Sequence, residues 1–179
     1  MLSRLSNEQP PIESTRLAAV AVIIAGDDEP KTLLIERAEH FEDPWSGQIA
    51  FPGGKMSGGD KSAKETAIRE TKEELSVDLG RDTSFAGYYD PFRTHTGSMD
   101  VIPAVFILRG RVKVIPNGEV SGYRWVSLSE FLQPRSSSRY RLEVGGFARD
   151  VPAFIIGDYV VWGLTHRIIT SLLGSSALE

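Results

Sequence analysis

A stretch without Pro or Gly, running from Ser62 to about Ser76, constrains the fold of this 179-residue chain more than any other feature. Ser62 and Glu65 form an S-x-x-E capping box at its start, so the sequence predicts a helix of about four turns. On either side of it the chain consists of short apolar runs bounded by turn residues, which is typical of strands. A helix set between groups of strands predicts an α/β fold with a mixed sheet.

The other elements are predicted from the alternation of apolar runs and turn residues. Strands are expected at 17–24, 31–37, 48–51, 85–89, 101–108, 112–115 and 123–126, with a weaker one at 151–156. A short helix is expected at 127–132, a polar and basic loop at 133–141, and a terminal helix at 158–173. The length suits one domain, which we assign to 16–179.

Residues 1–15 are polar and contain proline, so we expect an arm that is mobile or packs on a partner subunit. This arm is the basis for a hypothetical homodimer. The longest apolar run, 17–25, is too short to span a bilayer, and no targeting signal is visible. We therefore expect a cytoplasmic protein without a membrane partner.

Composition narrows the chemistry that the chain can perform. It has no cysteine, which excludes disulfides, thiolate metal sites and a Cys nucleophile. With only three histidines, a metal site would have to use oxygen ligands. The 20 basic and 24 acidic residues give a net charge of −4, which argues against a broadly basic nucleic-acid-binding surface.

The predicted helix carries Glu70, Glu73 and Glu74 on one arc and an apolar face on the adjacent arc. Like charges at these spacings repel in an isolated helix, and a divalent cation would reverse that cost. Carboxylate ligands select hard cations such as Mg²⁺ or Mn²⁺, which also bind phosphate oxygens. The alternative is an ordinary solvated acidic face, in which Arg69 and Lys72 neutralise the glutamates locally.

A glycine turn directly precedes this helix, in the sequence Phe51-Pro52-Gly53-Gly54-Lys55. Glycines permit close backbone approach, so a carbonyl of the turn could complete a metal-ligand set. The turn is not a P-loop, because Ile49 and Met56 stand where that motif needs Gly and Ser or Thr.

Together these features resemble the signature of the Nudix hydrolases, a family that cleaves phosphoanhydride bonds in nucleoside diphosphates linked to another moiety. The match consists of Gly54, the pair Arg69-Glu70 and the pair Glu73-Glu74. The resemblance implies an α/β/α sandwich with a mixed sheet, hydrolytic activity and bound Mg²⁺ or Mn²⁺. It also implies a small-molecule nucleoside diphosphate substrate.

Three positions depart from the usual signature. Asp60 is the first acid and is followed by one extra residue before the Arg-Glu pair, Thr71 replaces an apolar residue, and Ser76 replaces the final glycine. None of these changes removes a carboxylate from the acidic face.

The extra residue resembles the coenzyme A pyrophosphatase-like branch of the family, as does the stretch from Gln48 to Gly54. Trp45 stands where that branch usually has His, and Ala38 replaces a Ser. The branch substrate would give 4′-phosphopantetheine and adenosine 3′,5′-bisphosphate, and its 3′-phosphate would need a cationic pocket. The rival substrates are a nucleotide sugar, ADP-ribose, NADH or a dinucleoside polyphosphate.

The family pattern implies a role for each signature residue. Glu73 and Glu74 would ligate the metal together with the Gly54 carbonyl, while Glu70 would bind metal or take a proton from water. Arg69 would orient Glu70 through a charge-assisted hydrogen bond. The alternative for Arg69 is an ordinary helical ion pair with Glu73.

Residues outside the signature complete the predicted site. Glu119 lies in a loop where many family members place a further metal-binding or basic glutamate. Candidate substrate-binding residues are Arg37, Gln48, Phe51, Lys55 and Arg93. A non-catalytic nucleotide-binding regulator on the same scaffold remains the alternative from another class, and retention of the three carboxylates argues against it. RNA 5′-end processing is disfavoured by the pI.

Overall fold

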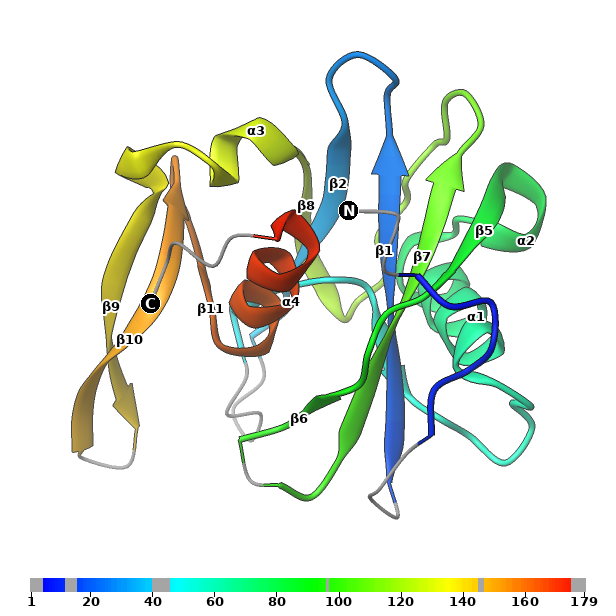
Figure 1. Ribbon diagram of the computed structural model, residues 1–179, viewed down its shortest axis with the longest axis horizontal. Coiled ribbons are helices and arrows are strands. Elements are labelled where there is room, and N and C mark those ends of the chain that lie inside the picture. The colour runs from blue at the N-terminus through cyan, green and yellow to red at the C-terminus, as the bar shows by residue number, and fades with distance from the viewer. Residues whose placement is uncertain (1–4, 12–15, 40–45, 96, 145–146, 175–179) are drawn as a thin grey trace.

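The computed structural model describes residues 5–11, 16–39, 46–95, 97–144 and 147–174. Trp45, noted in the sequence, lies outside these ranges. Figure 1 shows a strongly twisted sheet with helices on both faces and a separate, smaller group of strands beside the terminal helix.

The larger sheet has eight strands and a central order of β3-β2-β1-β7-β5, with β4 paired to β1, β6 to β7 and β8 to β2. Its central pair, β1 and β7, is parallel, and its other pairs are antiparallel, so the sheet is mixed as predicted. The strands are β1 (Leu17–Ala25), β2 (Lys31–Arg37), β3 (Ile49–Ala50), β4 (Gly53–Lys55), β5 (Thr83–Tyr88), β6 (Phe92–Arg93), β7 (Asp100–Leu108) and β8 (Val120–Ser127).

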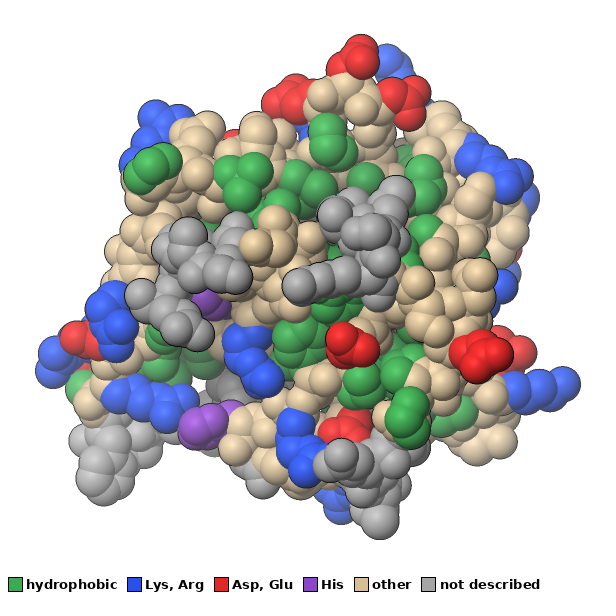
Figure 2. Space-filling view, viewed as in Figure 1, with side chains coloured by type: hydrophobic (Ala, Val, Ile, Leu, Met, Phe, Trp, Pro, Cys, Tyr) green, Lys and Arg blue, Asp and Glu red, His purple; other side chains and the backbone are tan. Residues whose placement is uncertain are grey.

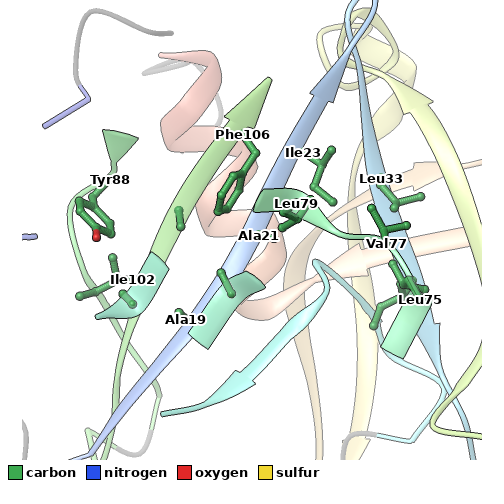
Figure 3. Packing of buried hydrophobic residues seen from close by; sticks show 14 of the residues in the cluster. Ala19, Ala21, Ile23, Leu33, Leu75, Val77, Leu79, Tyr88, Ile102 and Phe106 are labelled. Atoms are coloured by element: carbon green, nitrogen blue, oxygen red, sulfur yellow. The ribbon is translucent and has the colours of Figure 1, made fainter. Parts of the chain in front are cut away.

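Helices α1 (Ala63–Leu75) and α4 (Gly163–Leu173) cover opposite faces of this sheet. Successive side chains of β1 alternate between two hydrophobic clusters because strand residues point to opposite faces. One cluster joins Ala19, Ala21 and Ile23 to α1 (Figure 3), and the other joins Val22 and Ile24 to α4. The predicted α/β/α sandwich is confirmed.

The capping box at the start of α1 forms in part as predicted, because the Ser62 hydroxyl accepts a hydrogen bond from the Glu65 amide at 3.2 Å. At the other end, Ser76 caps the helix in the left-handed conformation, with φ of 57°. The acidic helix therefore begins and ends close to its predicted bounds.

A second sheet was not predicted from the sequence. It has three strands in the order β11-β10-β9 and is formed by β9 (Ser137–Val144), β10 (Phe147–Ile156) and β11 (Tyr159–Trp162). The prediction of a loop at 133–141 is thus wrong beyond the 3₁₀ turn Pro134–Ser136, because polar residues here form an exposed strand. The terminal helix also starts later than predicted, at Gly163, since residues 159–162 extend as β11.

Two smaller differences concern the segments after α1 and β7. The short helix α2 (Leu79–Asp82) precedes β5, and the predicted strand at 112–115 is absent from the described chain. Instead, the Ile115 amide donates to the Leu75 carbonyl at 2.9 Å, so this segment lies against the end of α1. The short helix predicted at 127–132 is confirmed as α3 (Leu128–Phe131).

The described part of the N-terminal arm packs on its own chain. Ser6 exchanges two backbone hydrogen bonds with Tyr88 at 2.9 and 2.7 Å, and the Gln9 side chain accepts from the Ala63 amide at 2.7 Å. Residues 5–11 therefore pack on their own chain, whereas the homodimer stays a prediction. Among the helices described, none is both long and apolar enough to cross a membrane.

Candidate active site

The glycine turn and the acidic helix meet through close backbone contacts. The Gly53 amide donates to Glu74 Oε2 at 2.9 Å, and a side chain at Gly53 would collide with the Ala19 carbonyl. A Cβ on Gly54 would lie 2.6 Å from the Glu70 carboxylate. Gly53 is therefore needed where it stands, because its Cβ would meet the backbone of β1, whereas a Cβ at Gly54 would meet only the end of the Glu70 side chain.

Arg69 lies at the centre of the carboxylates. Its guanidinium contacts Glu70 Oε1 at 2.8 Å and Glu73 Oε2 at 3.1 Å, and it donates to the Lys55 carbonyl at 3.1 Å. Arg69 therefore makes both of the contacts predicted for it. It contacts Glu70, as an orienting residue would, and it forms an ordinary helical ion pair with Glu73. One cation holds two glutamates and the end of β4 together.

Asp60 is a member of this network that the sequence showed only as a departure from the family pattern. Its carboxylate is 7% exposed and accepts from Arg69 Nε at 3.1 Å and from Nη2 at 2.9 Å. It also accepts from the Ser57 amide and hydroxyl and from Thr66 Oγ1. The Arg69 hydrogen bonds hold the pKa of Asp60 well below its usual range, so it stays ionised and anchors Arg69.

Glu74 is the buried carboxylate of the site, only 3% exposed. Burial raises its pKa to about 7, and the negative charges of Glu70 and Glu119 add to the shift. The Gly53 amide and the charge of Arg37 oppose it. Burial also raises the pKa of Glu70, against the stabilising contact from Arg69.

The loop that carries Glu119 lies against the acidic helix, because the Asn117 amide donates to the Glu74 carbonyl at 2.8 Å. The Glu119 side chain is exposed, and its amide donates to Asn117 Oδ1 at 2.8 Å. Its carbonyl accepts from the Ala38 amide at 2.8 Å, which ties this loop to the end of β2. The loop of Glu119 thus lies beside the acidic helix, and the role of its carboxylate stays a prediction.

The donor set matches the chemistry of a hard divalent cation, because it consists of carboxylates and backbone carbonyls with a buried, partly uncompensated negative charge. Within the described ranges no three acidic or histidine side chains already converge closely enough to hold an ion. The Glu73 side chain, 56% exposed, is turned toward Arg69 instead. The residues that would hold the ion are Glu70, Glu73, Glu74 and the Gly54 carbonyl, and the glutamate side chains would have to turn toward one another.

The predicted substrate-binding residues fall into two groups. Arg37 and Gln48 are neighbours at the end of β2 and the start of β3, where the Arg37 amide donates to the Gln48 carbonyl at 3.1 Å. Lys55 is exposed at the end of β4. Arg93 lies across the sheet on β6, where its Nε contacts Asp100 at 3.2 Å.

Phe51 does not present its ring to the site. It is 3% exposed and belongs to the hydrophobic cluster between the sheet and α4. Because the ring is buried in the core, it is not available to a substrate in this conformation, and the prediction that Phe51 binds substrate is wrong.

Comparison with known proteins assigns the family. The model of the NUDIX domain matches residues 15–143 of the chain. A protein of Yersinia enterocolitica named "Uncharacterized Nudix hydrolase NudL" is 33% identical over 178 residues, covering 96% of this chain and 89% of that protein.

Solved structures share the fold at lower identity. A MutT/nudix family protein from Enterococcus faecalis has a TM-score of 0.58 and 20% identity, covering 93% of this chain and 64% of that one. An Ap4A hydrolase from C. elegans has a TM-score of 0.52 and 21% identity, covering 63% of this chain and 80% of that one.

The chain belongs to the Nudix family and is a Nudix hydrolase acting on nucleoside diphosphate derivatives. Nudix hydrolases generally use divalent cations, in agreement with the oxygen donors gathered around Gly54.

Proposed function

We propose that this hydrolase cleaves the diphosphate linkage of coenzyme A or its derivatives with Mg²⁺ or Mn²⁺ as cofactor. The observation that carries the hydrolytic site is the contact between the Glu70 carboxylate and Gly54, beside the Glu74 carboxylate on the Gly53 amide. The choice of substrate is supported by the stretch from Gln48 to Gly54, which resembles the coenzyme A pyrophosphatase-like branch.

The reaction requires attack of water on one phosphorus atom and departure of the bridging oxygen with the other phosphate. A bound divalent cation would lower the pKa of the attacking water and neutralise charge on the diphosphate. The Glu70 carboxylate would accept the proton that the water loses, since Arg69 holds it at 2.8 Å beside the glycine turn. Glu119, whose negative charge helps to raise the pKa of Glu70 and of Glu74, is the second candidate to accept this proton.

Recognition of the substrate would fall to residues beside the acidic helix. The positive charge of Arg37 lowers the pKa of Glu74, so we assign this guanidinium to the diphosphate that would lie beside the acidic helix. Gln48 lies next to Arg37, since its carbonyl accepts a hydrogen bond from the Arg37 amide, and Lys55 is exposed at the end of β4. We assign these three residues to substrate binding.

A substrate panel tests the proposal. The purified protein is incubated with Mg²⁺ or Mn²⁺ and coenzyme A, a nucleotide sugar, ADP-ribose, NADH or a dinucleoside polyphosphate, and the products are identified by mass spectrometry. We expect 4′-phosphopantetheine and adenosine 3′,5′-bisphosphate from coenzyme A, with the highest kcat/KM of the panel. Faster turnover of another diphosphate would reject coenzyme A but keep the hydrolase.

The same panel separates an enzyme from a binding protein. Tight binding of a nucleotide without hydrolysis of any diphosphate, in Mg²⁺ or in Mn²⁺, would favour the non-catalytic regulator. Hydrolysis in ¹⁸O-labelled water then identifies the attacked phosphorus, because the label appears only in the product that contains the attacked phosphorus atom.

A further inference from the structure

A second group of basic side chains lies away from the acidic helix, near β6, β10 and α4. We define it as the basic cluster, formed by Arg93, His95, Arg149 and Arg167. Arg149 Nη1 lies 3.2 Å from His95 Nε2, and Arg167 Nη1 donates to the Arg93 carbonyl at 2.8 Å. Figure 2 shows basic and histidine side chains around a hollow on this face of the molecule.

The contacts hold the Arg149 and Arg167 guanidinium groups in place without neutralising them. Arg93 is paired with Asp100, but no carboxylate in the described part of the chain pairs with Arg149 or Arg167. The Arg167 guanidinium lies 5.5 Å from the centre of the Phe92 ring, a cation–π contact. Arginines without an acidic partner give this surface a positive potential, which attracts anions.

The neighbouring acid on the same strand does not compensate Arg149. Asp150 follows it on β10 and therefore points to the opposite face, where it lies across from Arg141 on β9. Arg149 lies across from Leu142 instead. The strand thus directs one cation toward His95 and the adjacent acid away from it.

Strand pairing relates the glycine turn to the strand that carries Arg93. Four residues lie side by side across β4, β1, β7 and β6: Lys55, Ala18, Val101 and Phe92. Three steps between neighbouring strands span about 14 Å. Because α1 and α4 cover opposite faces of the sheet, a substrate in contact with both sites would pass around the edge strand β3.

Gln48 provides a second connection between the two sites. Its Nε2 atom lies next to Gly163, so that a Cβ there would come within 3.3 Å of it. Arg167 follows Gly163 by about one turn of α4. Gln48 therefore lies between Arg37, on the side of the acidic site, and α4, the helix that carries Arg167 of the basic cluster.

We propose that the basic cluster binds a second phosphate of the substrate, a phosphomonoester separate from the diphosphate that is cleaved. This inference rests on the proposed function, and it assigns Arg149 and Arg167 as the residues that select substrates with this group. Arginine suits the role because its planar guanidinium forms paired hydrogen bonds with phosphate oxygens.

A matched pair of substrates tests the proposal, namely coenzyme A and 3′-dephospho-coenzyme A, which differ only in the phosphomonoester. We expect the wild-type protein to favour coenzyme A in kcat/KM. In Arg149→Ala and Arg167→Ala, kcat/KM for coenzyme A should fall roughly tenfold to a hundredfold further than for the dephosphorylated substrate. Arg149→Lys should retain part of the preference.

Arg141→Ala is the matched control. It removes an arginine from the same hairpin, but Arg141 lies on the opposite face from Arg149 and contacts Glu143 at 3.8 Å. We expect it to keep the wild-type ratio of the two kcat/KM values. Equal wild-type kcat/KM for both substrates, or an equal loss for both in Arg149→Ala and Arg167→Ala, would overturn the proposal.

A binding measurement distinguishes this failure from failure of the proposed function. Titration calorimetry compares adenosine 3′,5′-bisphosphate with adenosine 5′-monophosphate on the wild-type protein and on Arg149→Ala. Preferential binding of the bisphosphate, lost in the variant, supports the basic cluster even if coenzyme A is not hydrolysed. Equal affinities for the two nucleotides reject it even if hydrolysis is observed.

Discussion

The polar side chains on the two faces of α1 differ in how completely they find hydrogen-bond and ion-pair partners. On the polar face, Arg69 contacts two glutamates of its own helix and Asp60 of the preceding loop. On the packed face, Thr71 is fully buried, and its hydroxyl has no hydrogen-bond partner within the described structure. The charged groups on the polar face are therefore held by mutual contacts, while the packed face buries a hydroxyl group without a partner, which a substitution could remove.

This difference indicates that catalysis and stability are separable along one helix. Changes on the polar face should lower activity, and one of them should raise stability because it removes a buried charge. Changes on the packed face should raise stability without affecting activity.

The largest effect is expected for the double variant Glu73→Gln with Glu74→Gln. Neutral amides cannot replace carboxylates as ligands of a hard cation, so kcat should fall by roughly a thousandfold or more. Hydrolysis is measured against Mg²⁺ concentration, with circular dichroism to verify the fold. Glu65→Gln, in the exposed first turn of the same helix, is the control. Full activity of the double variant would remove these residues from the metal site.

The next largest effect is expected for Asp60→Asn. The change removes the ionised partner of Arg69, so the free energy of unfolding should fall by about 2–3 kcal/mol. Misplacement of Arg69 and Glu70 should also lower kcat by roughly tenfold. Urea unfolding and steady-state kinetics measure the two effects.

Asp82→Asn is the comparison for this variant. Asp82 is also paired with an arginine, Arg81, but that pair lies at the surface. Its loss should change stability little. If the two variants behaved alike, Asp60 would have no special role in the network.

The sequence predicted α1 and six of the eight strands of the larger sheet because their apolar periodicity is clear, but not β4 and β6, which have only three and two residues. The prediction failed where a strand is exposed and lacks apolar alternation, or where an apolar strand runs directly into a helix. Strand β9 begins Ser137-Ser138-Arg139, with no apolar alternation, so a loop was the natural prediction. Tyr159–Trp162 is apolar throughout and merges with the helix that follows, so the start of α4 could not be placed.

The candidate site divides in the same way. The glutamates and glycines of the signature could be predicted because they follow one another along a short segment. Asp60 could be identified as a deviation, but its contact with Arg69 depends on how the loop folds back. The basic cluster could not be predicted, because strand pairing and helix packing bring its members together from distant segments.

A third prediction concerns the buried charge of Glu74. Its pKa in the folded protein is about 7, above the ordinary value of 4.5, so the fold favours the protonated form. Without divalent cation, stability should therefore decrease as pH rises from about 4.5 to 7, by on the order of 2 kcal/mol.

The variant Glu74→Gln tests this pH dependence. It should lose this part of the slope and be the more stable protein above pH 7, although it is inactive. Denaturant unfolding in EDTA at pH 5, 6, 7 and 8 measures the difference. Parallel stability curves for the two proteins would show that Glu74 carries no such penalty.

A fourth prediction concerns the packed face of α1. Thr71→Val replaces a buried hydroxyl without a partner by a methyl group, so stability should rise by about 1 kcal/mol. Thr66→Val is a matched control, since Thr66 is equally buried but donates to Asp60 Oδ2 and to the Ser62 carbonyl. That variant should be destabilised. A loss of stability in Thr71→Val would show that its hydroxyl is satisfied.

The smallest effect is expected at Ser76, where the helix ends. With φ of 57°, Ser76 is the one non-glycine residue with positive φ in the described chain, and its amide caps the Lys72 carbonyl at 3.0 Å. Glycine adopts this conformation without a Cβ penalty but loses more backbone entropy on folding. The net gain for Ser76→Gly should be about 0.5–1 kcal/mol, with activity unchanged.

Ser76→Ala separates this conformational effect from loss of the hydroxyl. Alanine keeps the Cβ that is disfavoured in the left-handed region, so its stability should stay close to that of the wild type. A stabilisation of equal size in both variants would mean that the serine side chain, not the backbone, is the source of the cost. A gain confined to glycine would place the strain in the backbone at the end of α1, away from Arg69 and its carboxylates.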